Sequence, residues 1–147
     1  MAAVLGAVVG SVATGGAAFV TSAGAARLQR RKERRESCLS LMEEALGVLH
    51  LTEDVMFHAT EARAEGRTPD YSQFEARTLE SRRRVEKCCD ILVLSGPRRV
   101  KGACDVLTEA VGQVYSAVKH GDEARLAGAV GGLLQGMDVL RQRASGI

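Results

Sequence analysis

The chain has 147 residues, a net charge of only +2, five aromatic residues and no tryptophan. This length provides for one domain and hardly for two. The scarcity of aromatic residues, and the lack of alternating Val, Ile, Tyr and Phe stretches that fill a pleated surface, argue against an all-β fold. Ala, Leu, Glu and Arg dominate the second half and favour helices. The sequence therefore predicts an all-α protein.

The first segment, residues 1–26, contains no charged side chain and no proline. About 20 apolar residues in a helix span the core of a bilayer, so we expect an N-terminal transmembrane anchor here. Its apolar bulk is modest, because most of its residues are Ala, Gly, Ser or Thr. A cleaved signal peptide, with small residues at 22–26, and a soluble or peripheral segment are the alternatives.

A basic juxtamembrane segment, residues 27–36, follows at once. It holds two acidic and six basic side chains, which are Arg27, Arg30, Arg31, Lys32, Arg34 and Arg35. Its net charge is therefore +4, and that of the remaining chain is −2. The positive-inside rule predicts a cell-membrane protein with the N-terminus outside and the C-terminal part in the cytoplasm. We expect these six side chains at the membrane surface, and no nucleic acid on the rest of the chain.

The spacing of Gly6 and Gly10 is a GxxxG pattern within the expected anchor. Small residues at this spacing let two membrane helices pack closely. A segment so rich in Ala and Gly also produces such a pattern by composition alone. Helix packing through Gly6 and Gly10 is accordingly one of two explanations that stay open.

The remaining residues, 37–147, are expected to form a soluble helical bundle. Apolar residues at helical spacing predict the core face of a first helix, which Gly66 would end. They are Cys38, Leu41, Met42, Ala45, Leu49, Val55, Met56 and Ala59. A second helix is predicted to start at residues 68–70, with Thr68 as cap and Pro69 in the first position. It should end at residues 95–97, Ser-Gly-Pro.

A third helix should run from near Pro97 to Gly121, and Asp122 should cap the fourth. The fourth helix has a coiled-coil seam in alternating steps of four and three, at Leu126, Val130, Leu133, Met137, Leu140 and Ala144. The glycines of this helix lower its intrinsic stability. Contacts with neighbouring helices, or close packing at the glycines, must therefore stabilise it. The short turns predict an antiparallel, up-down arrangement.

A candidate metal site is offered by His50, Asp54 and His58, which recur every four residues on one side of a helix. The alternative is an ordinary solvated face. Asp54 is expected to point to water, and no fourth ligand is near in sequence. We therefore predict no metal site.

The cysteines at 38, 88, 89 and 104 form no CxxC pair. Cys88, Cys89 and Cys104 lie at similar distances from the 95–97 turn, so a hairpin would bring them to one level. A redox or metal cluster is the sharper interpretation, but Cys is also a common small core residue. We expect core packing.

No phosphate loop, nucleophile elbow, HExxH or Ser/His/Asp set occurs. The sequence thus predicts no enzyme, no catalytic residue and no cofactor. It favours a membrane-tethered interaction or scaffold protein, whose partners are the lipid bilayer and either another protein or a second copy of the chain. Arg98 and Arg99, in the expected turn, would join the basic segment at the membrane. A metal- or thiol-dependent sensor is an alternative.

The layout of residues 1–26, the basic residues 27–35 and the turn between Leu92 and Val100 resembles small actinobacterial single-pass membrane proteins with a helical bundle. Among these is a KilB-like group associated with plasmid transfer. The resemblance implies an accessory role in DNA transfer or in another membrane machine, and it carries over no functional residue.

Overall fold

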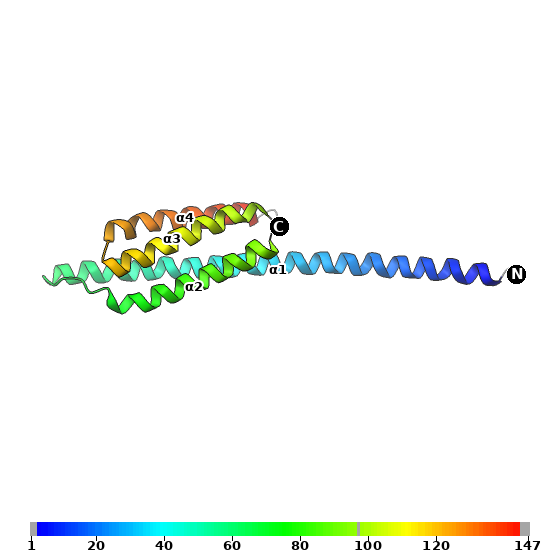
Figure 1. The fold of residues 1–147 in the computed structure, drawn as a ribbon, viewed down its shortest axis with the longest axis horizontal. Coiled ribbons are helices and arrows are strands. Elements are labelled where there is room, and N and C mark those ends of the chain that lie inside the picture. Colours follow the sequence, from blue (N-terminus) through cyan, green and yellow to red (C-terminus); the bar gives the residue numbers. More distant parts are fainter. Residues whose placement is uncertain (1–2, 97, 145–147) are drawn as a thin grey trace. The chain divides into compact units, whose positions relative to one another are not determined.

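The computed structural model describes the backbone of residues 3–96 and 98–144, and the side chains of residues 23–96 and 98–143. This part contains four α-helices and no strand, which confirms the predicted all-α class (Figure 1). The helices are α1 (Ala3–Ala64), α2 (Ser72–Ser95), α3 (Lys101–His120) and α4 (Glu123–Ala144), with a short 3-10 helix, η1 (Arg98–Val100), before α3.

The chain divides into two compact units, residues 1–33 and 34–147, and the boundary falls inside the expected basic segment. In the first unit, Arg27, Arg30, Arg31 and Lys32 are exposed. The packing role expected for Gly6 and Gly10 concerns residues 1–22, whose surroundings lie outside the described part.

None of the helices in the described residues combines the length and the apolar character needed to cross a membrane. This finding gives no support to the transmembrane anchor expected over residues 1–26. The anchor therefore remains a prediction from the sequence.

The described residues from Arg34 onward, 34–96 and 98–144, form a bundle in which neighbouring helices are antiparallel. Residue numbers rise along α1 while they fall along α2 in the contacts Arg34–Ser95, Ser40–Cys88, Glu44–Arg84, Asp54–Arg77 and His58–Gln73. On α3 and α4, Leu107 lies opposite Gly136 and Ala110 opposite Gly132. The short turns produce the up-down arrangement that the sequence predicts.

Glycines end α1 and α3 as expected. Gly66 and Gly121 have φ angles of +70° and +64°, a left-handed conformation in which a side chain would be strained. The Asp122 amide donates to the carbonyl of Ala117 at 2.9 Å, which closes the last turn of α3. The Asp122 carboxylate then accepts the Arg125 amide at 2.9 Å and caps α4.

Helix α2 begins later than predicted, at Ser72 instead of at residues 68–70. The Asp70 carboxylate accepts the amide of Ser72 at 2.9 Å, a local turn that competes with the helix. The Tyr71 hydroxyl donates a hydrogen bond to the Glu123 carboxylate at the start of α4. These two contacts keep residues 67–71 out of the helix, so Thr68 does not cap α2.

The core of the bundle is aliphatic, and each large buried side chain contributes roughly 1.5–3 kcal/mol. Its largest fully buried members are Leu41, Val48, Val55, Val85, Leu92, Val100, Leu107, Val111, Val114, Leu126, Leu133 and Leu140. The predicted core face of α1 included Leu49 and Met56 and needs correction. Val48 and Leu51 are buried instead, whereas Met56 is exposed.

Helices α3 and α4 approach closely where α4 carries glycine. A Cβ atom on Gly136 would lie 2.7 Å from Leu107 Cγ, and one on Gly132 would lie 3.1 Å from Ala110 Cβ. The expectation that glycine allows α4 to pack closely is confirmed at these two positions. Around Gly128 and Gly131 the space is open.

Candidate functional site

The candidate metal ligands on α1 are placed in contacts with α2. Asp54 pairs with Arg77 at 3.5 Å, and the His58 ring meets the Phe74 ring edge-on with centroids 5.4 Å apart. Gln73 lies 3.2 Å from His58 Nε2, while His50 is exposed. Within the described residues, no three His, Cys, Asp or Glu side chains are grouped so that they could hold a metal.

The four cysteines are free thiols, three of them buried and Cys88 partly buried. The sequence predicted that the turn at residues 95–97 brings Cys89 and Cys104 to the same height in the bundle. This is confirmed, since Cys89 Sγ lies 3.8 Å from the Cys104 carbonyl. A side-chain interaction between the two thiols of Cys89 and Cys104, and then burial, raise the pKa of the Cys104 thiol. Burial also raises the pKa of Cys38. Higher pKa values leave less thiolate, the reactive form, which fits a packing role for Cys38 and Cys104.

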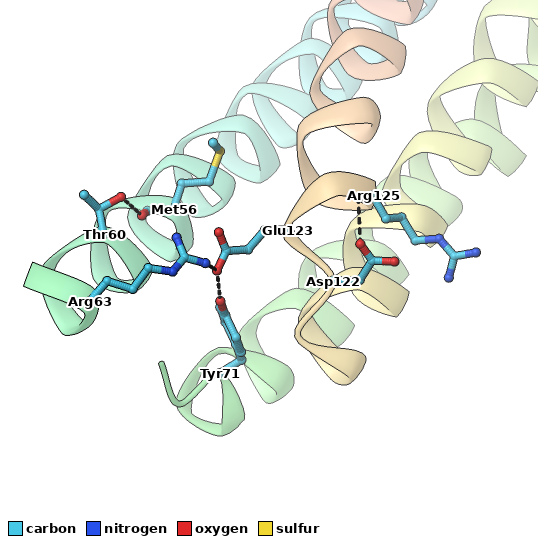
Figure 2. A network of polar contacts seen from close by, with 7 residues as sticks. All are labelled: Met56, Thr60, Arg63, Tyr71, Asp122, Glu123 and Arg125. Carbon is cyan, nitrogen blue, oxygen red and sulfur yellow. Dashed lines mark hydrogen bonds and ion pairs between the residues drawn. The ribbon is translucent and has the colours of Figure 1, made fainter. Parts of the chain in front are cut away.

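A cluster of polar contacts joins the last turn of α1 to the first turn of α4 (Figure 2). Glu123, in the first turn of α4, accepts hydrogen bonds from Arg63 of α1 and from the Tyr71 hydroxyl. The Arg63 hydrogen bond lowers the pKa of Glu123. Burial and the bond to Glu123 raise the pKa of Tyr71 to about 12. We call this end, defined by Arg63, Tyr71 and Glu123, the clasped end.

The side of α1 that faces away from the core carries a second apolar stripe. Leu39, Leu46 and Phe57 expose 62%, 41% and 71% of their surface. Met42 and Leu49 border the stripe; they are partly buried and pack against the core. We call the set Leu39, Met42, Leu46, Leu49, Met56 and Phe57 the outer face.

The outer face has the spacing of a coiled-coil seam. Positions 39, 42, 46, 49, 53 and 56 alternate in steps of three and four, which keeps one edge of a helix facing a partner helix. Two charged residues occupy this series, Glu53 within it and Arg35 one step before Leu39. A polar or charged residue within a seam specifies the register and the number of paired helices, at a cost in stability.

Basic side chains from three separate segments gather at the end of the bundle near the α2–α3 turn. Arg34 Nε donates to the Ser95 carbonyl at 3.1 Å, which places the start of this unit beside the turn. Helix η1 contacts α4, and the C-terminal end of α4 lies at the same end (Figure 1). We call this the basic end, made of Arg34, Arg35, Arg98, Arg99, Lys101, Arg141 and Arg143.

The basic end also exposes apolar side chains. Leu94, next to the Ser95 carbonyl that receives Arg34, exposes 87% of its surface, and Ile91 lies one turn earlier, also exposed. Two acidic residues, Glu36 and Asp138, lie close in sequence to members of the basic end, and Asp138 pairs with Arg141 at 2.9 Å. Positive charge therefore exceeds negative charge at this end.

Sequence reasoning found part of this surface. It singled out Arg34, Arg35, Arg98 and Arg99 but missed Lys101, Leu94 and the arginines of α4. The antiparallel register was the signal that could have found Arg141 and Arg143, because the last turn of α4 must return to the level at which α3 begins.

Comparison of the chain with protein family models, with curated proteins and with solved structures gives no match. The resemblance in layout to single-pass actinobacterial proteins is thus neither supported nor contradicted.

Proposed function

We propose that this protein is a membrane-tethered helical scaffold without catalytic activity, which binds a helix of another protein through the outer face of α1. The observation that carries the proposal is the exposure of Leu39, Leu46 and Phe57 on a helix whose opposite side already fills the core. Contiguous exposed apolar surface in a small protein marks an interaction site.

The tether is residues 1–26, followed by the basic residues from Arg27 onward. An uncharged segment of this length, flanked on one side only by arginines, favours a single-pass anchor with the bundle in the cytoplasm. Small residues throughout the segment make insertion weaker than that of a leucine-rich helix.

Charge in the seam favours a different protein over a second copy. Two copies anchored in the same membrane would pair their α1 helices in parallel, with equal positions opposite each other. Arg35 would then face Arg35, and Glu53 would face Glu53, which is unfavourable. A partner helix that offers an acidic residue to Arg35 and a basic residue to Glu53 removes both repulsions.

The tether is tested by fractionation of cells that carry the full chain with a C-terminal tag. We expect the protein to stay in the membrane pellet after a carbonate wash, with the tag protected from protease added outside. Release by carbonate contradicts the tether, and a tag cut from outside contradicts the orientation.

The partner is tested with a photo-crosslinking amino acid at Leu46 in the full chain, with the same group at Arg83 on α2 as control. We expect an adduct from position 46 alone, mapped to a helix with apolar residues in steps of three and four. Leu39→Glu should abolish it, and Glu53→Arg should weaken it. Adducts between two copies only, or equal adducts from both positions, would overturn the proposed partner.

A further inference from the structure

We infer that the basic end of the bundle is a docking surface for anionic phospholipid, with Leu94 as an apolar residue that enters the membrane interface. This inference deepens the proposed tether, because it assigns a membrane contact to the folded bundle itself. It depends on residues 34–143 alone and can fail or hold independently of residues 1–26.

The arrangement of charge supports a lipid surface. Seven basic residues belong to the start of the unit, to η1 and the first residue of α3, and to the last turns of α4, and these segments lie at one end of the bundle (Figure 1). The body of the chain outside residues 27–36 has a net charge of −2, so this concentration is local. Each basic residue near an anionic bilayer adds favourable free energy that falls off within a Debye length.

The apolar component separates a bilayer from other polyanions. Leu94 is the most exposed of the large apolar side chains that the structure describes, and it lies in the last turn of α2, directly before Ser95, whose carbonyl accepts the hydrogen bond from Arg34. An exposed leucine gains little from a nucleic-acid backbone. At a membrane interface it buries its side chain below the headgroups that the arginines bind.

The hydrogen bond from Arg34 to the Ser95 carbonyl links a basic residue of α1 to the end of α2 that carries Leu94. It joins the first turn of this unit to the residue that follows Leu94. The cations of α1 and η1 therefore reach the headgroups in the same position of the bundle that presents Leu94 to the acyl chains.

Because the chain has no tryptophan, Leu94→Trp introduces a single indole as a fluorescent reporter. The full chain is reconstituted in vesicles of phosphatidylcholine with or without 30% phosphatidylglycerol. We expect a blue shift of the indole emission, and quenching by brominated lipid, only with the anionic vesicles. Phe57→Trp, on an exposed residue of the outer face, is the matched control and should show neither change.

A second test of the docking surface replaces basic residues of the basic end. Arg98→Ala with Arg99→Ala, made in the Leu94→Trp protein, should weaken docking by roughly thirtyfold, and 0.5 M salt should weaken it further by screening. Arg83→Ala with Lys119→Ala, two exposed basic residues away from the basic end, should leave it unchanged. An unshifted emission of the Leu94→Trp protein in vesicles that retain the chain through carbonate overturns the docking surface and leaves the tether intact.

If the chain is released by carbonate, the Leu94→Trp protein is added to preformed vesicles. A shift of its emission with anionic vesicles then supports the docking surface while the tether fails. An emission change with duplex DNA but not with vesicles, or equal changes with neutral and anionic vesicles, overturns the inference.

Discussion

The two ends of the bundle treat charge in opposite ways. At the clasped end, the Glu123 carboxylate accepts hydrogen bonds from both Arg63 and the Tyr71 hydroxyl, so the opposite charges of α1 and α4 are matched within the protein. At the basic end, arginines from three segments meet with fewer acids among them, and Leu94 is exposed beside them. The difference fits a stabilising role for the clasped end and the membrane contact that we propose for the basic end.

The largest effect is expected from Gly121→Ala at the clasped end. Gly121 has a φ of +64°, and a Cβ atom there would lie 3.1 Å from Tyr71 Cε2. We expect a loss of about 2 kcal/mol in the free energy of unfolding, measured by urea unfolding of the full chain in detergent. Gly66→Ala, with a φ of +70° and open space, should cost about 1 kcal/mol. Equal losses would show that Tyr71 is not tightly placed.

Gly136→Ala tests whether the bundle is also tightly packed toward the basic end. The new methyl group would clash with Leu107, and we expect a net loss of about 1 kcal/mol after the gain in helix propensity. Gly131→Ala, in open space on the same helix, should instead stabilise the protein by up to about 1 kcal/mol. A stabilising Gly136→Ala would mean that α3 and α4 are farther apart than described.

Tyr71→Phe removes the hydroxyl that donates to Glu123 and should cost about 1 kcal/mol at pH 7. The raised pKa of Tyr71, about 12, means that the folded state favours the neutral phenol. Its contribution is complete below the ordinary value of 10 and is lost as the pH rises toward 12. The advantage of the wild type over Tyr71→Phe, measured by urea unfolding at several pH values, should shrink in that window.

Glu123 contributes with the opposite pH dependence. Its pKa is lowered by Arg63, so its stabilisation is present above its ordinary range and is lost as the pH falls through the lowered value. Glu123→Gln should remove this acid-side loss and also narrow the alkaline window of Tyr71, because the Glu123 carboxylate is one of the causes of the raised pKa of Tyr71. A loss of stability in acid that is the same in Glu123→Gln would assign it to other carboxylates.

The smallest effect on stability is expected at the basic end. Arg98→Ala with Arg99→Ala changes exposed side chains, and the free energy of unfolding should change by less than about 0.5 kcal/mol per residue. The same pair is expected to weaken lipid docking. A large loss of stability would erase the contrast between the two ends and assign Arg98 and Arg99 a structural role.

The amino-acid sequence by itself determined the helical class, the order of the helices and most of their ends. Gly66, Gly121 and Asp122 act through local backbone chemistry, which needs no knowledge of the rest of the chain. The short turns at residues 95–97 and 121–122 then require antiparallel neighbours. The predicted start of helix α2 was wrong because Thr68 and Pro69 are equally good signals for a turn.

Only the tertiary structure decided which side of α1 is buried and which basic residues share a surface. Helix α1 is apolar on two sides, and the positions of α2, α3 and α4 select Val48 and Leu51 over Met56. The basic end joins Arg34, Arg98 and Arg141, which are far apart in sequence and meet only through the lengths and directions of the helices between them. Burial and charge clustering are properties of several elements together, so no single segment of the sequence specifies them.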